Sequence, residues 1–154
     1  MAILRFITEP STVNLDLRNS SGWYVGEGLD LGGIEKTRKY LRQEGVDGAE
    51  LAKSWANVVQ MTIPLILTAQ ANSSAMLSLL DALNTELRKT TNVLEYLPHG
   101  LTGTTYLMDT FEADEVSLAD GQRVRTPWVT PGYGYLIVVR IDRQPNMRGR
   151  GIVV

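Results

Sequence analysis

Apolar and polar residues alternate along much of the chain, and a period of two is typical of β-strands that bury one face. Val13, Leu15 and Leu17 alternate with polar neighbours, which predicts a half-buried strand. The longest alternation covers residues 55–70 and predicts a single long strand. Because proline cannot donate a hydrogen bond to a neighbouring strand, we expect Pro64 at a sheet edge or at a bulge.

Further strands are predicted at the start of the chain and after residue 90. They cover residues 1–10, 93–97, 104–113 and 133–141. The last of these has apolar residues on both faces, so we expect it in the centre of a sheet or against a partner. Asp120-Gly121 lies between two short alternating segments and predicts a tight hairpin.

One stretch has the helical period instead. Its apolar residues recur every three or four positions and form one stripe, which consists of Met76, Leu79, Leu80, Leu83 and Leu87. We expect a helix over residues 74–89, with Asn72 or Ser73 as its N-cap and with Arg88 and Lys89 near the negative end of its dipole. The whole pattern predicts a mainly β protein, a sandwich or barrel with one flanking α-helix.

Two segments lack a clear apolar face. Residues 19–54 are rich in glycine and charge, and we interpret them as an arm that another chain supports. Residues 34–42 within it fit either a strand or a short helix, and the strand is favoured. A C-terminal tail at about residues 142–154 is arginine-rich and ends in apolar residues, which leaves docking onto a neighbouring subunit, pairing within the chain and disorder all open.

Composition narrows the class of protein. At 154 residues and 17.1 kDa the chain is the size of one domain, residues 1–154. A net charge of −2 argues against a broad basic surface for nucleic acid, and zero cysteines exclude disulfides and thiolate metal sites. No secretion signal and no membrane-spanning apolar run is present, so we expect a soluble protein made in the cytoplasm.

The search for catalytic or binding motifs yields none. The single histidine, His99, follows a proline and precedes a glycine, as in an exposed turn. The glycines of residues 26–31 begin like a dinucleotide fingerprint but lack the third glycine, and no phosphate-binding loop occurs. An acidic run, Glu112, Asp114, Glu115 and Asp120, fits a solvated hairpin flank better than a divalent-cation site. We therefore expect no enzyme, cofactor or metal.

The order of the segments carries a resemblance. A first pair of strands is followed by the glycine-rich stretch Val25–Gly33, by a charged arm that closes in Val46-Asp47-Gly48-Ala49, by the strand at 55–70 and by the helix. Over roughly residues 10–145 this order resembles the tail-tube and distal-tail (minor tail) protein superfamily of long-tailed bacteriophages.

The resemblance implies a tail-tube-like β fold that assembles as a hexameric ring around a channel through which DNA passes loosely. Such a subunit belongs to the virion tail, contacts neighbouring tail-tube and tail-tip proteins, and does not insert into membranes. Many distal tail proteins carry a further C-terminal domain that 154 residues cannot hold, so a major tail tube subunit stays as an alternative. A different class, a small ligand-binding β-barrel, would use Trp23, Trp55 and Trp128 as pocket walls.

Overall fold

A computed structural model describes residues 2–10, 12–18, 21–42, 44–45, 47–118 and 134–153. Its strands are β1 (Ile3–Thr8), β2 (Thr12–Asp16), β3 (Trp23–Val25), β4 (Lys36–Leu41), β5 (Glu50–Ala56), β6 (Val59–Leu67), β7 (Thr91–Leu97), β8 (Gly103–Leu118), β9 (Tyr135–Arg143) and β10 (Arg148–Val153). One helix, α1 (Ser73–Leu87), occurs in these ranges. The prediction of a mainly β protein with one helix is confirmed, whereas the predicted hairpin at Asp120-Gly121 lies outside the described residues.

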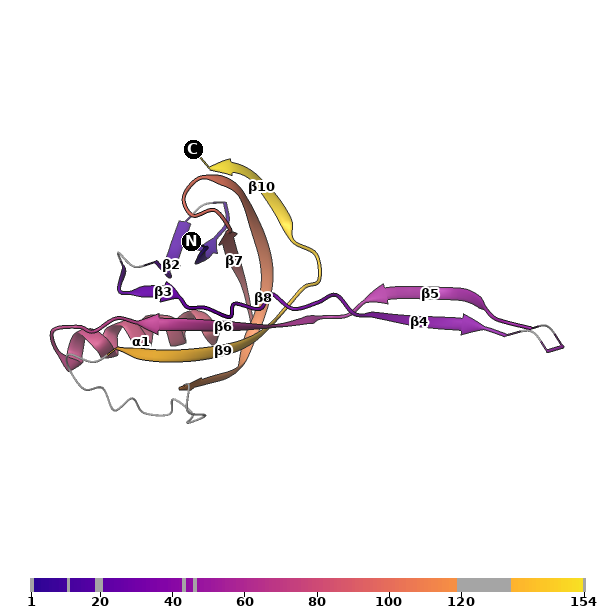
Figure 1. Cartoon of the computed structure of the whole chain (residues 1–154), viewed down its shortest axis with the longest axis horizontal. Helices are drawn as coiled ribbons and strands as arrows, with labels where there is room; N and C mark the ends of the chain where they lie inside the picture. The colour runs from indigo at the N-terminus through magenta and orange to yellow at the C-terminus, as the bar shows by residue number, and fades with distance from the viewer. Residues whose placement is uncertain are drawn as a thin grey trace.

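The main sheet is built around β8. The strands follow the order β2-β1-β7-β8-β9-β6-β3, and β10 also pairs with β8. Residues 106–111 of β8 pair with β7, while residues 110–118 pair with β9. Figure 1 shows β8 curving from one half of the sheet to the other, so that the sheet folds over itself. Its end strands, β2 and β3, do not pair with each other, so the sheet is an open sandwich rather than a closed barrel.

The core lies between the two halves of the folded sheet and includes one face of α1. Met76, Leu80, Leu83 and Leu87 of the helix join apolar residues from strands of both halves, among them the fully buried Trp23. The side chain of Asn72 accepts a hydrogen bond of 2.9 Å from the backbone N–H of Ala75 and caps the helix. The predicted apolar stripe and one of the two predicted caps are thus confirmed. Lys89 lies beyond the last turn and pairs with Glu86 instead of the helix terminus.

The prediction of one strand over residues 55–70 is wrong. Two strands occupy this stretch, because the chain leaves β5 at Ala56 and starts β6 at Val59. Both are extended, so the alternation of apolar and polar residues runs across the break. Pro64 lies in β6, opposite Val138 of β9, and its carbonyl accepts a hydrogen bond from Gly26, just beyond the end of β3. Pro64 is buried inside the sheet, and no N–H is required of it because β3 has already ended at Val25, opposite Leu65.

The predicted arm at residues 19–54 is too long at its start. Residues 23–25 form β3 and pair with β6, because Trp23 and Val25 both point into the core. The projecting part consists of β4 and β5 with their flanks, and residues 36–41 adopt the favoured strand. In the tail, β10 pairs antiparallel with residues 103–107 of β8, which is the intrachain outcome among the three left open. β9 lies between β8 and β6, in the centre of the sheet as expected.

Candidate functional site

The most conspicuous surface is a hairpin that projects from the body of the molecule (Figure 1). We call residues 34–58 the hairpin arm. Its strands, β4 and β5, pair only with each other, in a separate two-stranded sheet, and every residue of β4 is exposed. An isolated two-stranded hairpin is at best marginally stable in water. Contacts with residues outside the hairpin would therefore stabilise this arm.

Apolar side chains gather on the hairpin arm. Ten large apolar residues of the described chain are solvent-exposed, and six of them lie here, each 43–57% exposed: Ile34, Tyr40, Leu41, Leu51, Trp55 and Val58. Exposed apolar side chains are ordinary when scattered singly, whereas a group of them marks an interaction surface. The concentration on one thin projection makes the hairpin arm the candidate interaction surface of the described chain.

The register places these apolar residues on both faces of the hairpin arm. Tyr40 pairs with Leu51, whereas Thr37 pairs with Trp55 on the opposite face. A bulge in β5 between these pairs changes the alternation of that strand. The Lys53 ammonium lies 5.3 Å from the centre of the Trp55 ring, close enough for a cation–π contact. A partner that covers only one face would leave apolar area exposed on the other.

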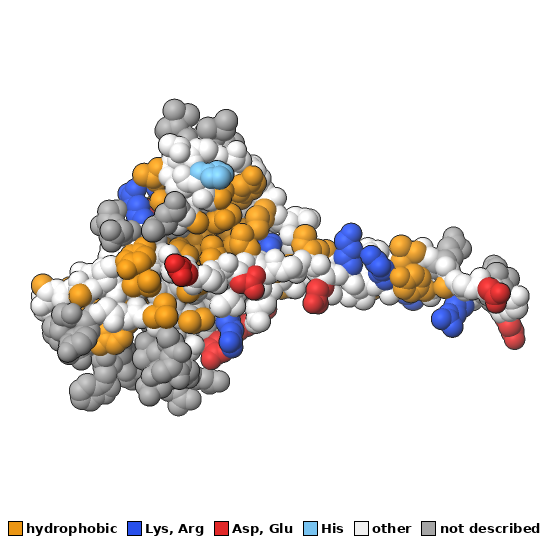
Figure 2. Space-filling view, viewed as in Figure 1, with side chains coloured by type: hydrophobic (Ala, Val, Ile, Leu, Met, Phe, Trp, Pro, Cys, Tyr) orange, Lys and Arg blue, Asp and Glu red, His pale blue; other side chains and the backbone are white. Residues whose placement is uncertain are grey.

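Charge is distributed unevenly along the hairpin arm. Its two strands carry the basic residues Lys36, Arg38, Lys39 and Lys53, with Arg42 directly after β4. Of its acidic residues, Glu35 lies at the base, Glu44 and Asp47 lie in the turn, and Glu50 begins β5. Figure 2 shows blue side chains along the strands of the projection and red ones at its far end. The two strands together carry four basic residues and one acidic residue, a local excess of positive charge on a chain with a net charge of −2.

The residues singled out for chemistry do not converge. His99 is exposed in the turn after β7, where the Gly100 N–H donates to the Leu97 carbonyl at 3.2 Å. Trp23 lies in the core and Trp55 on the hairpin arm, while Trp128 falls outside the described residues. The two visible tryptophans therefore share no pocket, and the open sheet offers no barrel interior.

The acidic run lies in β8 as far as it is described. Asp114 accepts a hydrogen bond of 3.1 Å from the Gln60 amide, and Glu115 pairs with Arg140 at 2.9 Å. Burial and the neighbouring Asp114 carboxylate raise the pKa of Asp142 above its ordinary value. Within the described ranges no three metal-ligating side chains form a group. These carboxylates make ordinary contacts across neighbouring strands.

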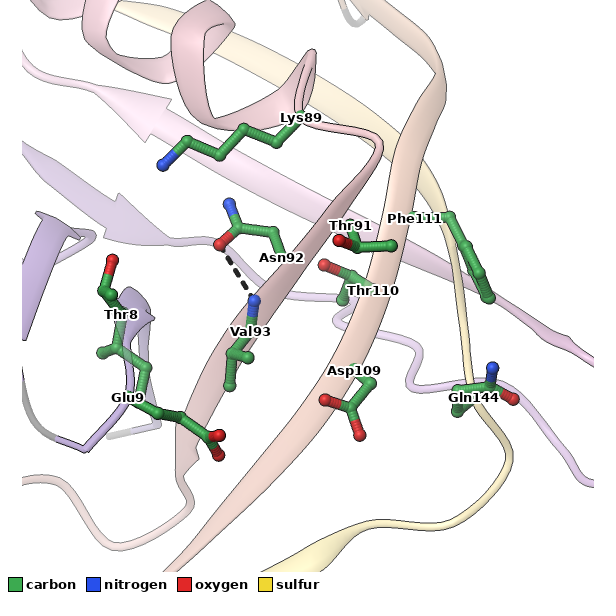
Figure 3. Close-up of a pocket in the computed structure, with 11 residues that line it drawn as sticks. Thr8, Glu9, Lys89, Thr91, Asn92, Val93, Asp109, Thr110, Phe111 and Gln144 are labelled. Atoms are coloured by element: carbon green, nitrogen blue, oxygen red, sulfur yellow. Dashed lines mark hydrogen bonds between the residues drawn. The ribbon is translucent and has the colours of Figure 1, made fainter.

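A hollow of about 520 Å³ lies beside the end of β1 and the middle of β8 (Figure 3). Its charged groups are already paired, since Glu9 and Asp109 both contact Arg148 and Lys89 contacts Glu86. Asn92 accepts a hydrogen bond from the backbone of Val93, as the dashed line shows. Charged groups that already form ion pairs within the chain have few free donors or acceptors for a ligand. The hollow is therefore a weaker candidate for a functional site than the hairpin arm.

Among the residues that the structure describes, no helix has the length and apolar character that crossing a membrane requires. No protein-family model matches the chain, and no curated protein matches its sequence.

Solved structures give the one informative comparison. The chain is similar to the Dit protein of phage SPP1, described as a paradigm of the hub adsorption apparatus in phages that infect Gram-positive bacteria, with a TM-score of 0.55 and 12% identity. The match covers 94% of this chain and 50% of Dit, so the chain spans about half the length of that protein. A baseplate structure of the anti-feeding prophage matches at a TM-score of 0.45 and 10% identity, over 99% of this chain and 94% of that one. The fold of this chain is therefore one that also makes up about half of the SPP1 Dit protein.

Proposed function

We propose that this chain is a structural subunit of a phage tail that assembles as a ring, at the level where the tail tube joins the tail tip. The fold shared with Dit, a protein of a phage adsorption hub, supports the class of protein. The hairpin arm carries the proposal, because it exposes six large apolar side chains and has no partner strand in the described chain.

Ring assembly follows from the shape of the hairpin arm. When the projection of one copy binds a different surface on the next copy, the contact is head-to-tail, and it closes into a ring if the rotation between copies allows. A hexamer is the closure that we propose. The hairpin arm would then be covered on both faces by neighbouring copies, which removes its exposed apolar area from water.

The proposed role is mechanical and involves no catalysis. A ring around a DNA channel has to let phosphates pass without binding them, and a chain with a net charge of −2 suits loose, non-specific passage. The partners are then further copies of the chain and the adjoining tail-tube and tail-tip proteins. The finished protein resides in the tail of the virion.

The test is the mass and shape of the purified protein. Light scattering should give a multiple of 17.1 kDa, with six copies expected, and negative-stain images should show rings with a central hole. Rings that remain single support the position at the tube end, whereas rings that stack into tubes support the major tube subunit. A chain that stays monomeric at high concentration contradicts ring assembly.

Variants can then assign the interface to the hairpin arm. Leu41→Ser together with Trp55→Ser removes exposed apolar area from it and should yield folded monomers. Leu77→Ser is the matched control, because Leu77 is 41% exposed, close to the 43% of Trp55, but lies on α1. Loss of the ring in both variants would argue against a specific role of the hairpin arm.

A further inference from the structure

The hairpin arm leaves the body through a joint with many contacts. On the incoming side, the backbones of Asp30 and Thr62 exchange two hydrogen bonds, of 2.9 and 3.0 Å. At the start of the hairpin arm itself, the Asn57 N–H donates to the Glu35 carbonyl at 2.8 Å, and the Thr37 hydroxyl donates to the Asn57 side chain at 2.9 Å. The incoming leg is thus bonded to β6, and the two legs are bonded to each other at the base of the hairpin arm.

A close backbone approach tightens the same joint. Gly32 has a φ of +77°, and its N–H donates to the Asp30 side chain at 2.9 Å. A Cβ at this position would lie 2.5 Å from the carbonyl oxygen of Gln60, nearer than real Cβ atoms come to other atoms. The incoming leg therefore lies directly against the start of β6, and only glycine fits between them.

A buried arginine lies at the centre of this joint. Arg143 ends β9 and is only 2% exposed. Its Nε donates to the Leu31 carbonyl at 3.0 Å, and its Nη1 donates to the carbonyls of Gln144 and Pro145 at 2.9 and 3.2 Å. In the β6–β9 register its partner is Val59, the first residue after the hairpin arm. One side chain therefore binds the incoming leg while its backbone pairs with the outgoing leg.

The partners of Arg143 are unusual for a buried cation. Within the described residues, its guanidinium donates to three backbone carbonyls, and no carboxylate lies within ion-pair distance. Burying a charge costs free energy, so the position requires something that a smaller neutral side chain does not supply. The rigid, planar guanidinium supplies several donors in fixed directions and can join two chain segments at once.

We infer that Arg143 is a positioning residue that sets the direction in which the hairpin arm leaves the body. The purpose of this positioning rests on the proposed function, because a ring closes only if the hairpin arm leaves every copy at the same angle. The positioning of the hairpin arm by Arg143 takes place within a single chain. Without the guanidinium, the Leu31 carbonyl loses its donor, and the backbone hydrogen bonds from the incoming leg to β6 are those of Gly26 and Asp30.

The direction of the hairpin arm can be measured by pulsed electron resonance between two nitroxide labels. The chain has no cysteine, so Lys36→Cys at the base of the hairpin arm and Ser78→Cys on α1 give two unique labels. The measurement uses the Leu41→Ser, Trp55→Ser chain, which holds the arm free of neighbouring copies. It therefore reports on Arg143 whether or not the unmodified protein forms rings.

Arg143→Gln should broaden the distance distribution, whereas the parent chain should give one narrow peak. Arg140→Gln is the control, because Arg140 lies on the same strand but is exposed and pairs with Glu115 at the surface. It should leave the peak unchanged. An Arg143→Gln chain that folds and keeps the narrow peak, or a broad peak in the parent chain, overturns the inference.

Amide hydrogen exchange provides a second measurement if Arg143→Gln does not fold. Arg143→Lys keeps the charge, but its donors all sit on one nitrogen, which cannot occupy the separate positions of Nε and Nη1. Exchange at the Asn57 N–H should become about 10- to 100-fold faster, the change expected for one lost bond to a charged group, while Ile63 in the core of β6 should change much less. Equal acceleration at Asn57 and Ile63 means that Arg143 stabilises the fold in general, and overturns the positioning role.

Discussion

Two glycines allow the cost of the close approach at the base of the hairpin arm to be separated from the cost of backbone conformation. Gly28 and Gly32 both have a positive φ, of +90° and +77°. A Cβ added at Gly28 meets nothing within 4 Å, whereas one at Gly32 lies 2.3 Å from a Val59 methyl carbon and 2.5 Å from the Gln60 carbonyl oxygen. Alanine at Gly28 therefore tests conformation alone, and alanine at Gly32 adds the steric clash.

The magnitudes follow from this difference. An L-residue in the left-handed region costs roughly 1–2 kcal/mol, so Gly28→Ala should lower the free energy of unfolding by about that amount. Forcing extra atoms into a packed site costs typically about 1–3 kcal/mol more, so Gly32→Ala should cost about 2–5 kcal/mol in total. The Gln60 oxygen belongs to the backbone of β6, so rotating a side chain cannot relieve the clash.

Urea unfolding followed by tryptophan fluorescence measures both variants. Trp23 is fully buried and reports on the core, and the midpoint shift at constant slope gives the change in stability. Equal losses for Gly28→Ala and Gly32→Ala would refute the reasoning, because they would show that the incoming leg moves away from β6 at no cost. The described packing at the base of the hairpin arm would then be wrong.

Three further outcomes are expected. Leu83→Ala should cost about 2–5 kcal/mol in thermal or chemical unfolding, because Leu83 is 1% exposed in the core, and Asn84→Ala should cost far less. The raised pKa of Asp142 means that the folded state binds this proton more tightly than the unfolded state, so the contribution of Asp142 to stability should fall as pH rises above 3.8. Asp142→Asn should remove this fall in unfolding measurements across that range. Trypsin should cut the monomeric chain first after Arg38 or Arg42, as mass spectrometry of early fragments can show, and assembly should slow these cuts.

The elements that depend on local periodicity were predictable from the sequence. The stripe from Met76 to Leu87 allows only one helix face to be buried, and the asparagine before it supplies the cap. The change from β5 to β6 at Asn57 and Val58 was not predictable, because alternation continues while the chain passes from the hairpin arm into the main sheet. β3 was missed because its three residues lie among glycines, although Trp23 is an apolar signal that could have located it.

The candidate site, too, was predictable from the sequence only in part. An arm at residues 19–54 was predicted from charge and glycine content, and residues 36–56 of this region form the projecting hairpin. Its support by neighbouring copies stays a prediction. The role of Arg143 was not, because in sequence it is one of four arginines near the C-terminus, and only the three-dimensional register of β9 against β6 brings it to the base of the hairpin arm. Contacts across more than a hundred residues, such as that with Leu31, leave no local pattern.

The position of β9 has a consequence for biosynthesis. β9 lies between β8 and β6, yet residues 68–134 separate it from β6 in the sequence and are synthesised before it. Until residue 143 has emerged, β6 has only the short β3 beside it, and its apolar face and the distal half of β8 lack the strand that joins them. Pairing between strands so distant in sequence forms slowly, and exposed strand edges favour aggregation. A nascent chain therefore stays vulnerable at these strands until β9 has been synthesised and has paired with both of them.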